Sequence, residues 1–493
     1  MLMHGINFSH SVTPKVAVPD NTKLHITSSF DGESTGQIDL RLIETLRVLE
    51  GRREVWLAEM TATGCRVVAK RFFSGGKQSK ESQREIDGLN ELKQRGVPSP
   101  RLLFAAVDKS GGLWVVAEFI EDAAELGDVF FRNENPSSLR AAIRCFAQAL
   151  LLHWRNGVCQ TDAHYKNFLW DGLTLYTIDV GSIRFTSREV SAYARTKTLV
   201  RMCHKFTDEM WSIFLSSYNE AARTDKEKQF ASFLRTDRFS CKMEQGRKLD
   251  VQRFWHKCQR NCTEFERIDH GGVMLLRNRK KDRAFSDALI DDPESFMNQG
   301  ERLKSGNTCT VQRIEWGENR YVVKRYNRKS LFYRIRHLLS VSRVVQSWAN
   351  ANVLSRLGIR TAEVFIACEF RKFGLLDKGY IVMECVEGET MSSVMRLPSL
   401  PVDDRKRYIT EAVDLFENLY QNRIVHGDMK AKNLLAQGGK LCLIDTDGMK
   451  LFLSKSRFCK LFEKDRRRFL KNWEDVPVLK VDFENLLSEL SVV

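Results

Sequence analysis

The chain has 493 residues, of which 43% are hydrophobic, 10% aromatic and 29% charged. These fractions lie near the globular averages and exclude disordered, collagenous and coiled-coil classes, while the length predicts two or three domains. The formal net charge of +15 favours a polyanionic partner such as nucleic acid, a phosphorylated glycan or an anionic membrane face.

No uncharged apolar run approaches ~18 residues, and residues 1–18 lack the cationic head and apolar stretch of a secretory signal. The sequence therefore predicts a cytoplasmic protein. The 12 cysteines include no C-x-x-C pair, as is typical of reduced thiols. The tightest cluster joins Cys258, Cys262 and His256 but lacks a fourth ligand at zinc-finger spacing, so we expect no zinc site there.

The predicted elements begin after a polar segment, residues 1–36, which we interpret as an N-terminal extension without clear periodicity. A first domain is predicted over 37–270. Its β-branched run VVAKRF predicts a strand carrying Lys70, its next helix ends near Gly96, and a buried strand then ends at Glu118.

A linker is predicted over 271–295, where the basic run RNRKKDR is followed by DDPES. The second domain, 296–493, has the same order of elements as the first. A strand carries Lys324, a helix ends near Gly358, and a buried strand ends at Glu384.

The later part of each domain contains a repeated segment. NGVCQTDAHYKNFLWDGLTLYTIDVG begins at position 156, and NRIVHGDMKAKNLLAQGGKLCLIDTDG begins at position 422. In each segment an aspartate, an asparagine and a second aspartate recur at the same spacing, as Asp162, Asn167 and Asp179 and as Asp428, Asn433 and Asp445. The separation between Asp162 and Asp428 relates all three pairs, and it is called the repeat offset below.

A strand lysine, an Asp-x4-Asn loop and a later aspartate are the parts that phosphoryl transfer from ATP requires. HGDMKAKNLL resembles the catalytic loop of protein-kinase-like enzymes, so Asp428 is predicted to accept the proton of the attacking hydroxyl. Lys430 is predicted to neutralise charge beside the transferred phosphate. Asn433 and Asp445 are predicted to bind Mg²⁺, which prefers such oxygen ligands. In the first domain Asp162, Asn167 and Asp179 take the corresponding positions, while His164 stands where Lys430 stands.

Lys70 and Lys324 are predicted to contact the phosphates of ATP. Glu85, fifteen residues after Lys70, either forms the ion pair that holds this lysine or is a surface residue. In the second domain Ser347 stands opposite Glu85, and no acidic partner of Lys324 is evident there.

Glu118 and Glu384, with the residues that follow each, are either the hinge that meets adenine or ordinary strand ends. Neither domain has the G-x-G-x-x-G turn that covers phosphates, and EGRREVW and KSGNTCTVQ stand in its place.

Together these residues resemble the lipopolysaccharide core kinases, the heptose and Kdo kinases related to protein kinases. The second domain resembles them through VVKRYNRKSLFYRIRH, SWANANVLSRLGIRTAEV, HGDMKAKNLL, LIDTDGMK and FEKDRRRFLKNW, and the first through VVAKRF, QTDAHYKNFLW and YTIDVGSIRF. The resemblance implies an α+β fold of two tandem protein-kinase-like domains, each with a small β-rich N-lobe and a helical C-lobe. It also implies ATP and Mg²⁺, and transfer to a sugar hydroxyl of the lipopolysaccharide core intermediate at the cytoplasmic membrane face.

Departures from the pattern favour the second domain as the active one. The first loop reads QTD instead of HGD, although Asp179 is followed two residues later by a glycine, as in protein kinases. In the second domain Asp447 takes that glycine's place and is either a second metal ligand or a polar strand-end residue. The basic aromatic stretch 324–337 is either a contact with anionic inner membrane or a solvated helix.

Three rival functions remain open. A Ser/Thr protein kinase is disfavoured by the lack of A-P-E and by the segment 446–493 after Asp445, which we take as too short for a peptide-docking lobe. An aminoglycoside-type kinase shares the HGD-x4-N loop, but the basic charge disfavours cationic substrates. The third rival is a pseudokinase scaffold for envelope-glycan assembly. Nucleic acid is not expected as a partner, because no nucleic-acid-binding motif accompanies the charge.

Overall fold

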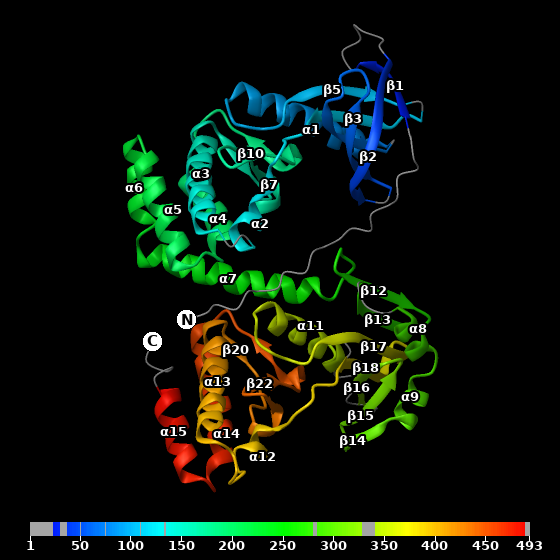
Figure 1. The fold of residues 1–493 in the computed structure, drawn as a ribbon, viewed down its shortest axis with the longest axis vertical. Helices are drawn as coiled ribbons and strands as arrows, with labels where there is room; N and C mark the ends of the chain where they lie inside the picture. Colours follow the sequence, from blue (N-terminus) through cyan, green and yellow to red (C-terminus); the bar gives the residue numbers. More distant parts are fainter. Residues whose placement is uncertain are drawn as a thin grey trace. The chain divides into compact units, whose positions relative to one another are not determined.

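The computed structural model describes residues 23–29, 37–49, 51–73, 75–108, 110–132, 135–279, 283–327 and 341–488. The chain divides between Gly246 and Arg247 into two compact units, here called the N-terminal and C-terminal units (Figure 1). Helix α7 (Asp237–Lys257) contains this boundary. The domain boundary predicted at 271–295 is therefore wrong in position, because the chain enters the second unit earlier.

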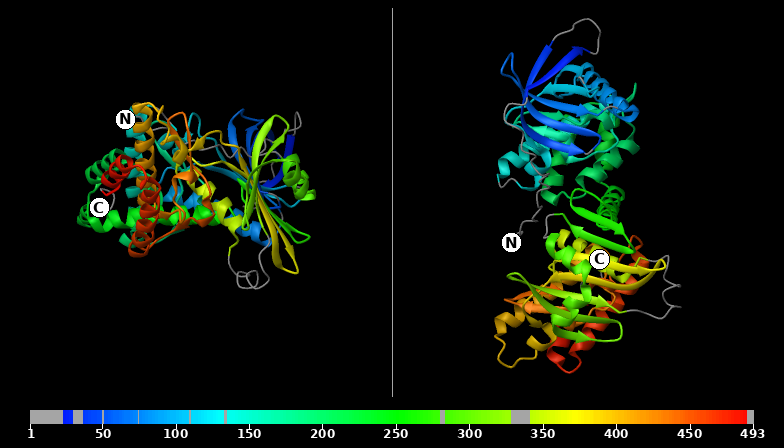
Figure 2. Two further views of the ribbon diagram at one scale, coloured as in Figure 1. Left: turned by 90° about the horizontal axis from the view of Figure 1, so that it is seen from below. Right: turned by 90° about the vertical axis from the view of Figure 1, so that its right-hand side faces the viewer.

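Six strands of the N-terminal unit form a closed antiparallel barrel, drawn in blue in Figure 2, in the order β1-β2-β3-β4-β6-β5. They are β1 (Lys23–Ser29), β2 (Gln37–Leu49), β3 (Arg53–Met60), β4 (Arg66–Phe72), β5 (Leu102–Val107) and β6 (Leu113–Glu118). Strand β1 pairs with both β2 and β5. Strand β1 lies within residues 1–36, which were interpreted as an N-terminal extension; a short polar strand shows too little periodicity to be recognised from the sequence.

The barrel determines where Lys70 points. Val67 and Ala69 of β4 are fully buried in the cluster that also contains Trp114 and Val116. Because side chains alternate along a strand, Lys70 lies on the opposite face of β4. Helix α1 (Gly76–Gln94) covers that face and brings Glu85 to the lysine.

The rest of the N-terminal unit is mainly helical and packs around α3 (Pro136–Arg155), which is capped by the Asn135 side chain. Phe146, Trp154 and Phe214 are among its largest buried side chains. The other helices are α2 (Leu126–Phe131), α4 (Ala192–Cys203), α5 (Asp208–Ala221) and α6 (Asp225–Phe233). The short elements are β7 (Ala124–Glu125), β8 (Val158–Gln160), η1 (Tyr165–Asn167), β9 (Phe168–Trp170), β10 (Leu175–Thr177), η2 (Val180–Ser182) and β11 (Ile183–Phe185).

The C-terminal unit contains a seven-stranded antiparallel sheet in the order β12-β13-β17-β18-β16-β15-β14. Its strands are β12 (Phe265–His270), β13 (Val273–Asn278), β14 (Glu301–Ser305), β15 (Cys309–Trp316), β16 (Asn319–Tyr326), β17 (Val364–Lys372) and β18 (Leu375–Glu384). The glycines of the HGG motif, Gly271 and Gly272, both have positive φ and form the tight turn between β12 and β13. The motif that was interpreted as a domain end is therefore a hairpin turn.

Residues predicted as a solvated linker form part of this unit's core. Arg277 is buried and donates hydrogen bonds to Glu266, Ser286 and Asp287. Helices α8 (Arg283–Asp291) and α9 (Pro293–Gln299) then lie on one side of the sheet and α11 (Arg343–Arg356) on the other (Figure 1). Apolar side chains such as Phe285 bury against the sheet, which explains why this charged segment folds.

The helical part of the C-terminal unit repeats the arrangement around α3. Helix α13 (Val402–Gln421) corresponds to α3 at the repeat offset, at its first residue and at its last. The other helices are α12 (Met391–Val394), α14 (Lys455–Leu470) and α15 (Pro477–Ser488). The short elements are β19 (Glu389–Thr390), β20 (Ile424–Val425), η3 (Ala431–Asn433), β21 (Leu434–Gln437), β22 (Lys440–Leu443), η4 (Thr446–Gly448), β23 (Lys450–Leu451) and η5 (Lys471–Trp473).

Candidate active site

Lys324 of β16 lies at the centre of the C-terminal site. Its ammonium group contacts Asp445 and lies 3.3 Å from Asp447 Oδ2, and its side chain is 8% exposed. Burial alone lowers the pKa of Lys324, but the surrounding Tyr326 and the carboxylates of Asp447 and Asp445 outweigh it and raise the pKa above the ordinary value. Lys324 is therefore charged, as a phosphate ligand must be.

The loop that contains Asp428 is fixed by hydrogen bonds on both sides. His426 is fully buried and its Nε2 lies 3.2 Å from the Ile444 carbonyl oxygen, while the Gly427 amide donates to buried Asp465 at 2.8 Å. Asn433 Nδ2 donates to the Asp428 carbonyl oxygen at 2.8 Å. The His426 contact joins this loop to the residue that precedes Asp445, the Gly427 bond joins it to α14, and the Asn433 bond lies within the loop.

Two cations lie beside the Asp428 carboxylate. Lys430 Nζ is 2.8 Å from Oδ1, and Arg468 Nη1 of α14 is 3.0 Å from the same oxygen. Arg468 also donates to the Gly427 carbonyl oxygen at 2.5 Å. The carboxylate is 42% exposed, so a hydroxyl from solvent can reach it.

The donor set of this site fits Mg²⁺. Asn433 uses its amide nitrogen to bind the loop, which leaves its carbonyl oxygen as a ligand, and Asp445 contributes a carboxylate. Magnesium usually needs only one or two protein oxygens besides phosphate and water. Within the described parts of the chain no three His, Cys, Asp or Glu side chains gather as a metal cage, so these two residues would share the ion with a nucleotide.

Asp445 has a left-handed backbone, with φ of 62°, and Asp179 in the N-terminal unit has φ of 56°. Such a conformation is uncommon for residues other than glycine and concentrates at functional sites. Burial raises the pKa of Asp445, but the neighbouring Lys324 outweighs it and holds the pKa below its usual value. The carboxylate is therefore ionised and suited to a cation.

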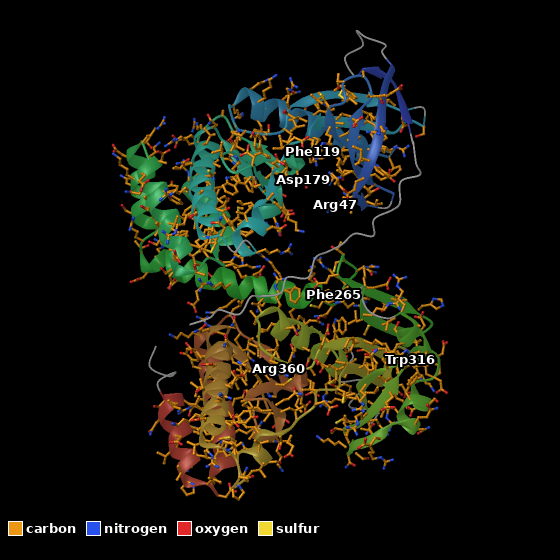
Figure 3. All side chains as sticks on the ribbon, in the orientation of Figure 1. Arg47, Phe119, Asp179, Phe265, Trp316 and Arg360 are labelled. Carbon is orange, nitrogen blue, oxygen red and sulfur yellow. The ribbon has the colours of Figure 1, made fainter. Side chains whose placement is uncertain are left out.

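In the N-terminal site the strand lysine is held by a helix. Lys70 forms an ion pair with Glu85 of α1, whose side chain is 3% exposed. The expected lysine–glutamate pair is thus present, and Glu85 is not a surface residue. Asp179, labelled in Figure 3, lies farther from its cation, with Arg53 Nη1 at 3.8 Å.

The N-terminal loop retains part of the C-terminal geometry. Asn167 Nδ2 donates to the Asp162 carbonyl oxygen at 2.9 Å, and Arg201 of α4 forms an ion pair with the Asp162 carboxylate. Burial and then the charge of Lys166 lower the pKa of His164, so at neutral pH this residue lacks the positive charge of Lys430.

The structure also locates the predicted hinge and phosphate-covering turns. Glu118 ends β6 and Glu384 ends β18, and each carboxylate accepts a backbone N–H, from Arg101 and Glu363 respectively. The turn between β2 and β3 and the turn between β14 and β15 replace a glycine-rich loop. Glu118 and Glu384 are exposed, and their carboxylates accept from the residues just before β5 and β17. The backbone after each glutamate is therefore the candidate that faces adenine.

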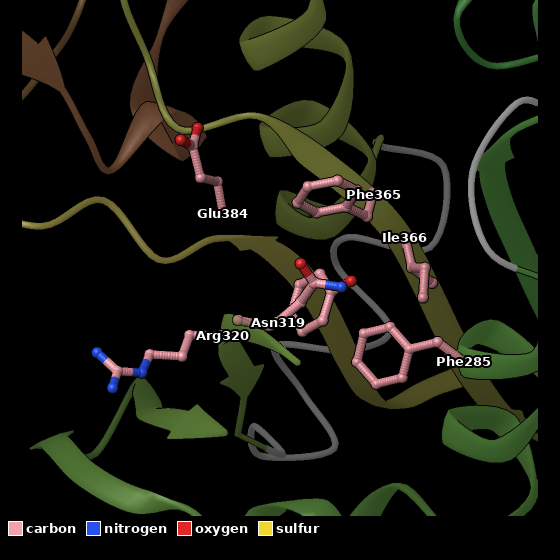
Figure 4. A pocket seen from close by; sticks show the side chains of 7 residues that line it. Phe285, Asn319, Arg320, Phe365, Ile366 and Glu384 are labelled. Carbon is pink, nitrogen blue, oxygen red and sulfur yellow. The ribbon is translucent and has the colours of Figure 1, made fainter. Parts of the chain in front are cut away.

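A separate cavity of about 380 Å³ lies beside Glu384, on the face of the sheet opposite Lys324. Figure 4 shows Phe285, Phe365 and Ile366 on one side of it and Arg320 and Glu384 on the other. Among the described residues, none from the catalytic loop lines this cavity. It is therefore distinct from the Lys324 and Asp428 cluster.

Three arginines that contact aspartates of these two sites were not assigned a role from the sequence. Arg343 binds Asp447, and Arg201 and Arg468 bind the loop aspartates. Asp447 was interpreted as a metal ligand or a strand end, whereas it forms ion pairs with Lys324 and Arg343. The arginines lie far from their partners in sequence, so only a tertiary structure reveals them.

Other predicted features have different outcomes. Cys258 is buried and Cys262 Sγ accepts a hydrogen bond from the Phe265 amide. The basic aromatic stretch 324–337 lies largely outside the described residues, which end at Asn327 before this gap. In the described part of the chain no helix has both the length and the apolarity needed to span a bilayer.

Residues 303–485 match the protein family described as RIO domain. The chain is 28% identical over 76 residues to the probable serine/threonine-protein kinase YbdM of Bacillus subtilis, covering 15% of this chain and 30% of YbdM. It is 30% identical over 111 residues to the KEOPS complex subunit Bud32 of Pyrococcus abyssi, covering 20% of this chain and 50% of Bud32. The chain thus spans at most half the length of these relatives.

Among solved structures, the BubR1 kinase domain aligns with a TM-score of 0.29 and 13% sequence identity, covering 39% of this chain and 68% of that domain. The sequence matches support a protein-kinase-like family, and they favour kinase-type phosphotransferase chemistry. These matches do not specifically support membership of the lipopolysaccharide core kinases. The region matched by the RIO domain contains Lys324, Asp428, Asn433 and Asp445.

Proposed function

We propose that the C-terminal unit is an ATP- and Mg²⁺-dependent kinase that phosphorylates a hydroxyl group. The observation that carries this proposal is that Lys324 pairs with Asp445, far along the chain, and that Ile444, the residue before Asp445, is hydrogen-bonded to His426 and Asn433 of the Asp428 loop. Asp428 accepts the hydroxyl proton, and Lys324 orients the phosphates.

Asn433 and Asp445 are the residues that would hold Mg²⁺, which when bound supplies charge neutralisation at the phosphates. Lys430 adds a positive charge beside Asp428 on the acceptor side. Arg468 fixes the Asp428 carboxylate and the preceding carbonyl group, so the general base keeps its orientation. These four residues divide the work between metal binding and positioning.

We further propose that the acceptor is a heptose or Kdo hydroxyl of the lipopolysaccharide inner core, at the cytoplasmic face of the inner membrane. The support for this acceptor is the resemblance in the segments around Lys324, Asp428 and Arg468, together with the +15 charge of the chain. An anionic acceptor and an anionic membrane both suit a basic protein.

The N-terminal unit is proposed to be a second kinase-like domain in tandem. Its support is the set Lys70, Asp162, Asn167 and Asp179, which recurs in the same order with the last three at the repeat offset. Because the Gln-Thr-Asp loop and neutral His164 depart from the C-terminal loop, we assign this unit a regulatory or scaffolding role and the transfer step to Asp428.

A serine/threonine protein kinase is the second candidate. The RIO domain match and the similarity to a probable serine/threonine-protein kinase favour a protein acceptor. The two candidates differ in the product, since one places phosphate on the core glycan and the other on a polypeptide.

Mass spectrometry of lipopolysaccharide core from cells with and without this gene tests the first candidate. We expect the core to lose the mass of one phosphate, and wild type but not Asp428→Ala to restore it. An unchanged core, with Asp428-dependent labelling of protein from radioactive ATP, would favour the second candidate. An unchanged core without such labelling would contradict both.

A further inference from the structure

The anchor of Lys324 comes from the loop after β22 and not from the helix. Asp447 of η4 lies 3.3 Å from Lys324 Nζ, and its side chain is 11% exposed. The same carboxylate oxygen is 2.5 Å from Arg343 Nη2, at the start of α11. Helix α11 itself contains no aspartate or glutamate. Lys324 therefore has a buried carboxylate partner that is separate from the candidate metal ligand Asp445.

Contacts within each unit show which residues of the two helices correspond. In the N-terminal unit Gly88 of α1 packs against Val180, the residue after Asp179. In the C-terminal unit Asn350 of α11 donates at 2.8 Å to the carbonyl oxygen of Thr446, the residue after Asp445. Three residues before Gly88 and before Asn350 lie Glu85 and Ser347, so Ser347 occupies the position of Glu85.

At the second residue after each site aspartate, the N-terminal unit has no carboxylate and the C-terminal unit has one. Gly181, two residues after Asp179, is so close to Glu85 that a Cβ added there would lie 3.6 Å from its Oε2. Asp447 takes the place of Gly181, two residues after Asp445. One unit therefore has a helix glutamate with a loop glycine, and the other has a helix serine with a loop aspartate.

The charge one helical turn before this position also differs between the two helices. Glu81 in α1 stands four residues before Glu85, and Arg343 in α11 stands four residues before Ser347. Arg343 donates to Asp447, and burial, which lowers its pKa, is outweighed by this carboxylate. Helix α11 has no carboxylate of its own at this site, and its Arg343 instead binds the loop carboxylate of Asp447.

We propose that Asp447 is a positioning residue that replaces the missing helix glutamate and holds Lys324 toward the phosphates. This inference rests on the proposed function of the C-terminal site. Because Asp447 keeps one ion pair with Lys324, Asp445 can leave the lysine and bind a cation without leaving the ammonium group unpaired in a buried site. The α11 helix then needs only its hydrogen bonds from Ser347 and Asn350 to dock on the loop.

The test moves the carboxylate back to the helix in the full-length chain. Mg-ATP affinity is measured by calorimetry for Asp447→Gly, for Asp447→Gly with Ser347→Glu, and for Asp447→Gly with Ser347→Gln. Loss of one charge-assisted contact should weaken binding about tenfold to a hundredfold. Glutamate at 347 should restore most of this loss, and glutamine, of the same size without charge, should not.

Thermal unfolding of the same nucleotide-free proteins provides the second readout. The midpoint should fall in Asp447→Gly and recover with Ser347→Glu but not with Ser347→Gln. Asp447→Asn, with the same two second-site changes, replaces the glycine series if that variant does not fold. Unchanged Mg-ATP binding in Asp447→Gly, or equal rescue by glutamine, would overturn the inference.

Failure of the proposed function gives a different result. In that case the wild-type chain itself binds no Mg-ATP, and the unfolding midpoints alone decide whether Asp447 anchors Lys324. The same order of midpoints then supports the anchor, and equal midpoints in all variants contradict it.

Discussion

The N-terminal and C-terminal units contain the same kinds of candidate site residue but connect them by different ion pairs. In the N-terminal unit a helix carboxylate, Glu85, holds Lys70, and Asp179 pairs with Arg53 at 3.8 Å. In the C-terminal unit Lys324 contacts two loop carboxylates, Asp445 and Asp447. The comparison shows that the order of residues along the chain was retained while the electrostatic connections changed.

The two loops that contain Asp162 and Asp428 differ in how firmly they are held, and here the C-terminal unit has the better-bonded arrangement. His426 binds the Ile444 carbonyl oxygen through Nε2 and leaves only its buried Nδ1 without a partner, whereas Gln160, at the corresponding position, has no hydrogen-bond partner for either polar atom of its buried amide group among the described residues. A buried amide without partners costs free energy, so the N-terminal loop is less firmly held. The N-terminal unit thus retains the lysine–helix pair, and the C-terminal unit retains the firmly bound loop.

The largest expected effect is on the rate of phosphate transfer, which should depend on the C-terminal loop and not on the N-terminal loop. Asp428→Ala should lower the rate of phosphate transfer from ATP about 10²- to 10⁴-fold, because it removes the general base. Asp162→Ala should leave transfer close to wild type, as measured by labelled product from core oligosaccharide. A comparable loss in Asp162→Ala would show that both units transfer phosphate, and an unchanged rate in the double variant would remove the catalytic assignment.

A second difference concerns acid stability. His153 is fully buried, lies 2.9 Å from Thr177 Oγ1, and has its pKa lowered by burial from 6.5 to about 4. At the repeat offset from His153 and Thr177 the C-terminal unit has Leu419 and Leu443, both buried. The unfolded chain protonates His153 more readily than the folded chain does, so its contribution is complete above pH 6.5 and is lost as pH falls toward 4.

The expected loss in free energy of unfolding of the N-terminal unit is about 3 kcal/mol between these pH values. Hydrogen exchange at several pH values, read separately for each unit, measures it. The double variant His153→Leu with Thr177→Val should remove this pH dependence. An equal acid loss in the C-terminal unit would show that His153 is not its source.

A third difference concerns one backbone position before each loop. Gly157 has φ of 66°, and Arg423, its counterpart at the repeat offset, has φ of 50°. A Cβ at Gly157 would lie 2.2 Å from the Thr186 carbonyl oxygen, so Gly157→Ala should lower the free energy of unfolding by about 2 kcal/mol. Arg423→Gly should change it by less than ~1 kcal/mol, since glycine accepts this conformation. Urea unfolding of both variants measures the asymmetry, which equal losses would contradict.

The smallest expected effect concerns the arginines beside the loops. Arg201 and Arg468 each contact the loop aspartate and the carbonyl group of the residue before it. Arg468→Ala should lower kcat about tenfold through loss of one charge-assisted hydrogen bond, with KM for ATP unchanged. Arg201→Ala is the matched control and should not change kcat. A rise in KM for ATP in Arg468→Ala would instead indicate a contact with the nucleotide.

Local sequence patterns predicted much of the fold and of the site. The β-branched runs predicted that Lys70 and Lys324 lie on strands, now seen as β4 and β16, and the repeat offset aligned each Asp-x4-Asn loop with its counterpart. These features depend on neighbours in the chain, so spacing reveals them. The sequence also predicted that Ser347 takes the position of Glu85, because each stands at the same distance before its glycine, Gly358 or Gly96.

The remaining features depend on tertiary contacts. The hairpin β12–β13 was missed because His-Gly-Gly was interpreted as a boundary, although its strand Val273–Asn278 pairs with β17, far along the chain. The sequence assigned no partner to Arg343, Arg201 or Arg468, because an arginine on a helix is ordinarily solvated. This holds even for Arg468, which lies in the segment FEKDRRRFLKNW. Asp447 could be placed near Lys324 only once α11 and η4 were seen together.

The paired exchange at the two lysines limits how either unit can evolve. Starting from Glu85 and Gly181, one substitution gives a lysine with no buried carboxylate, and the other gives two carboxylates in one small space. We expect both intermediates to be less stable than either end state, which would make the two positions epistatic. Exchange of segments between the two units would therefore keep the lysine paired only when the helix and the loop are transferred together.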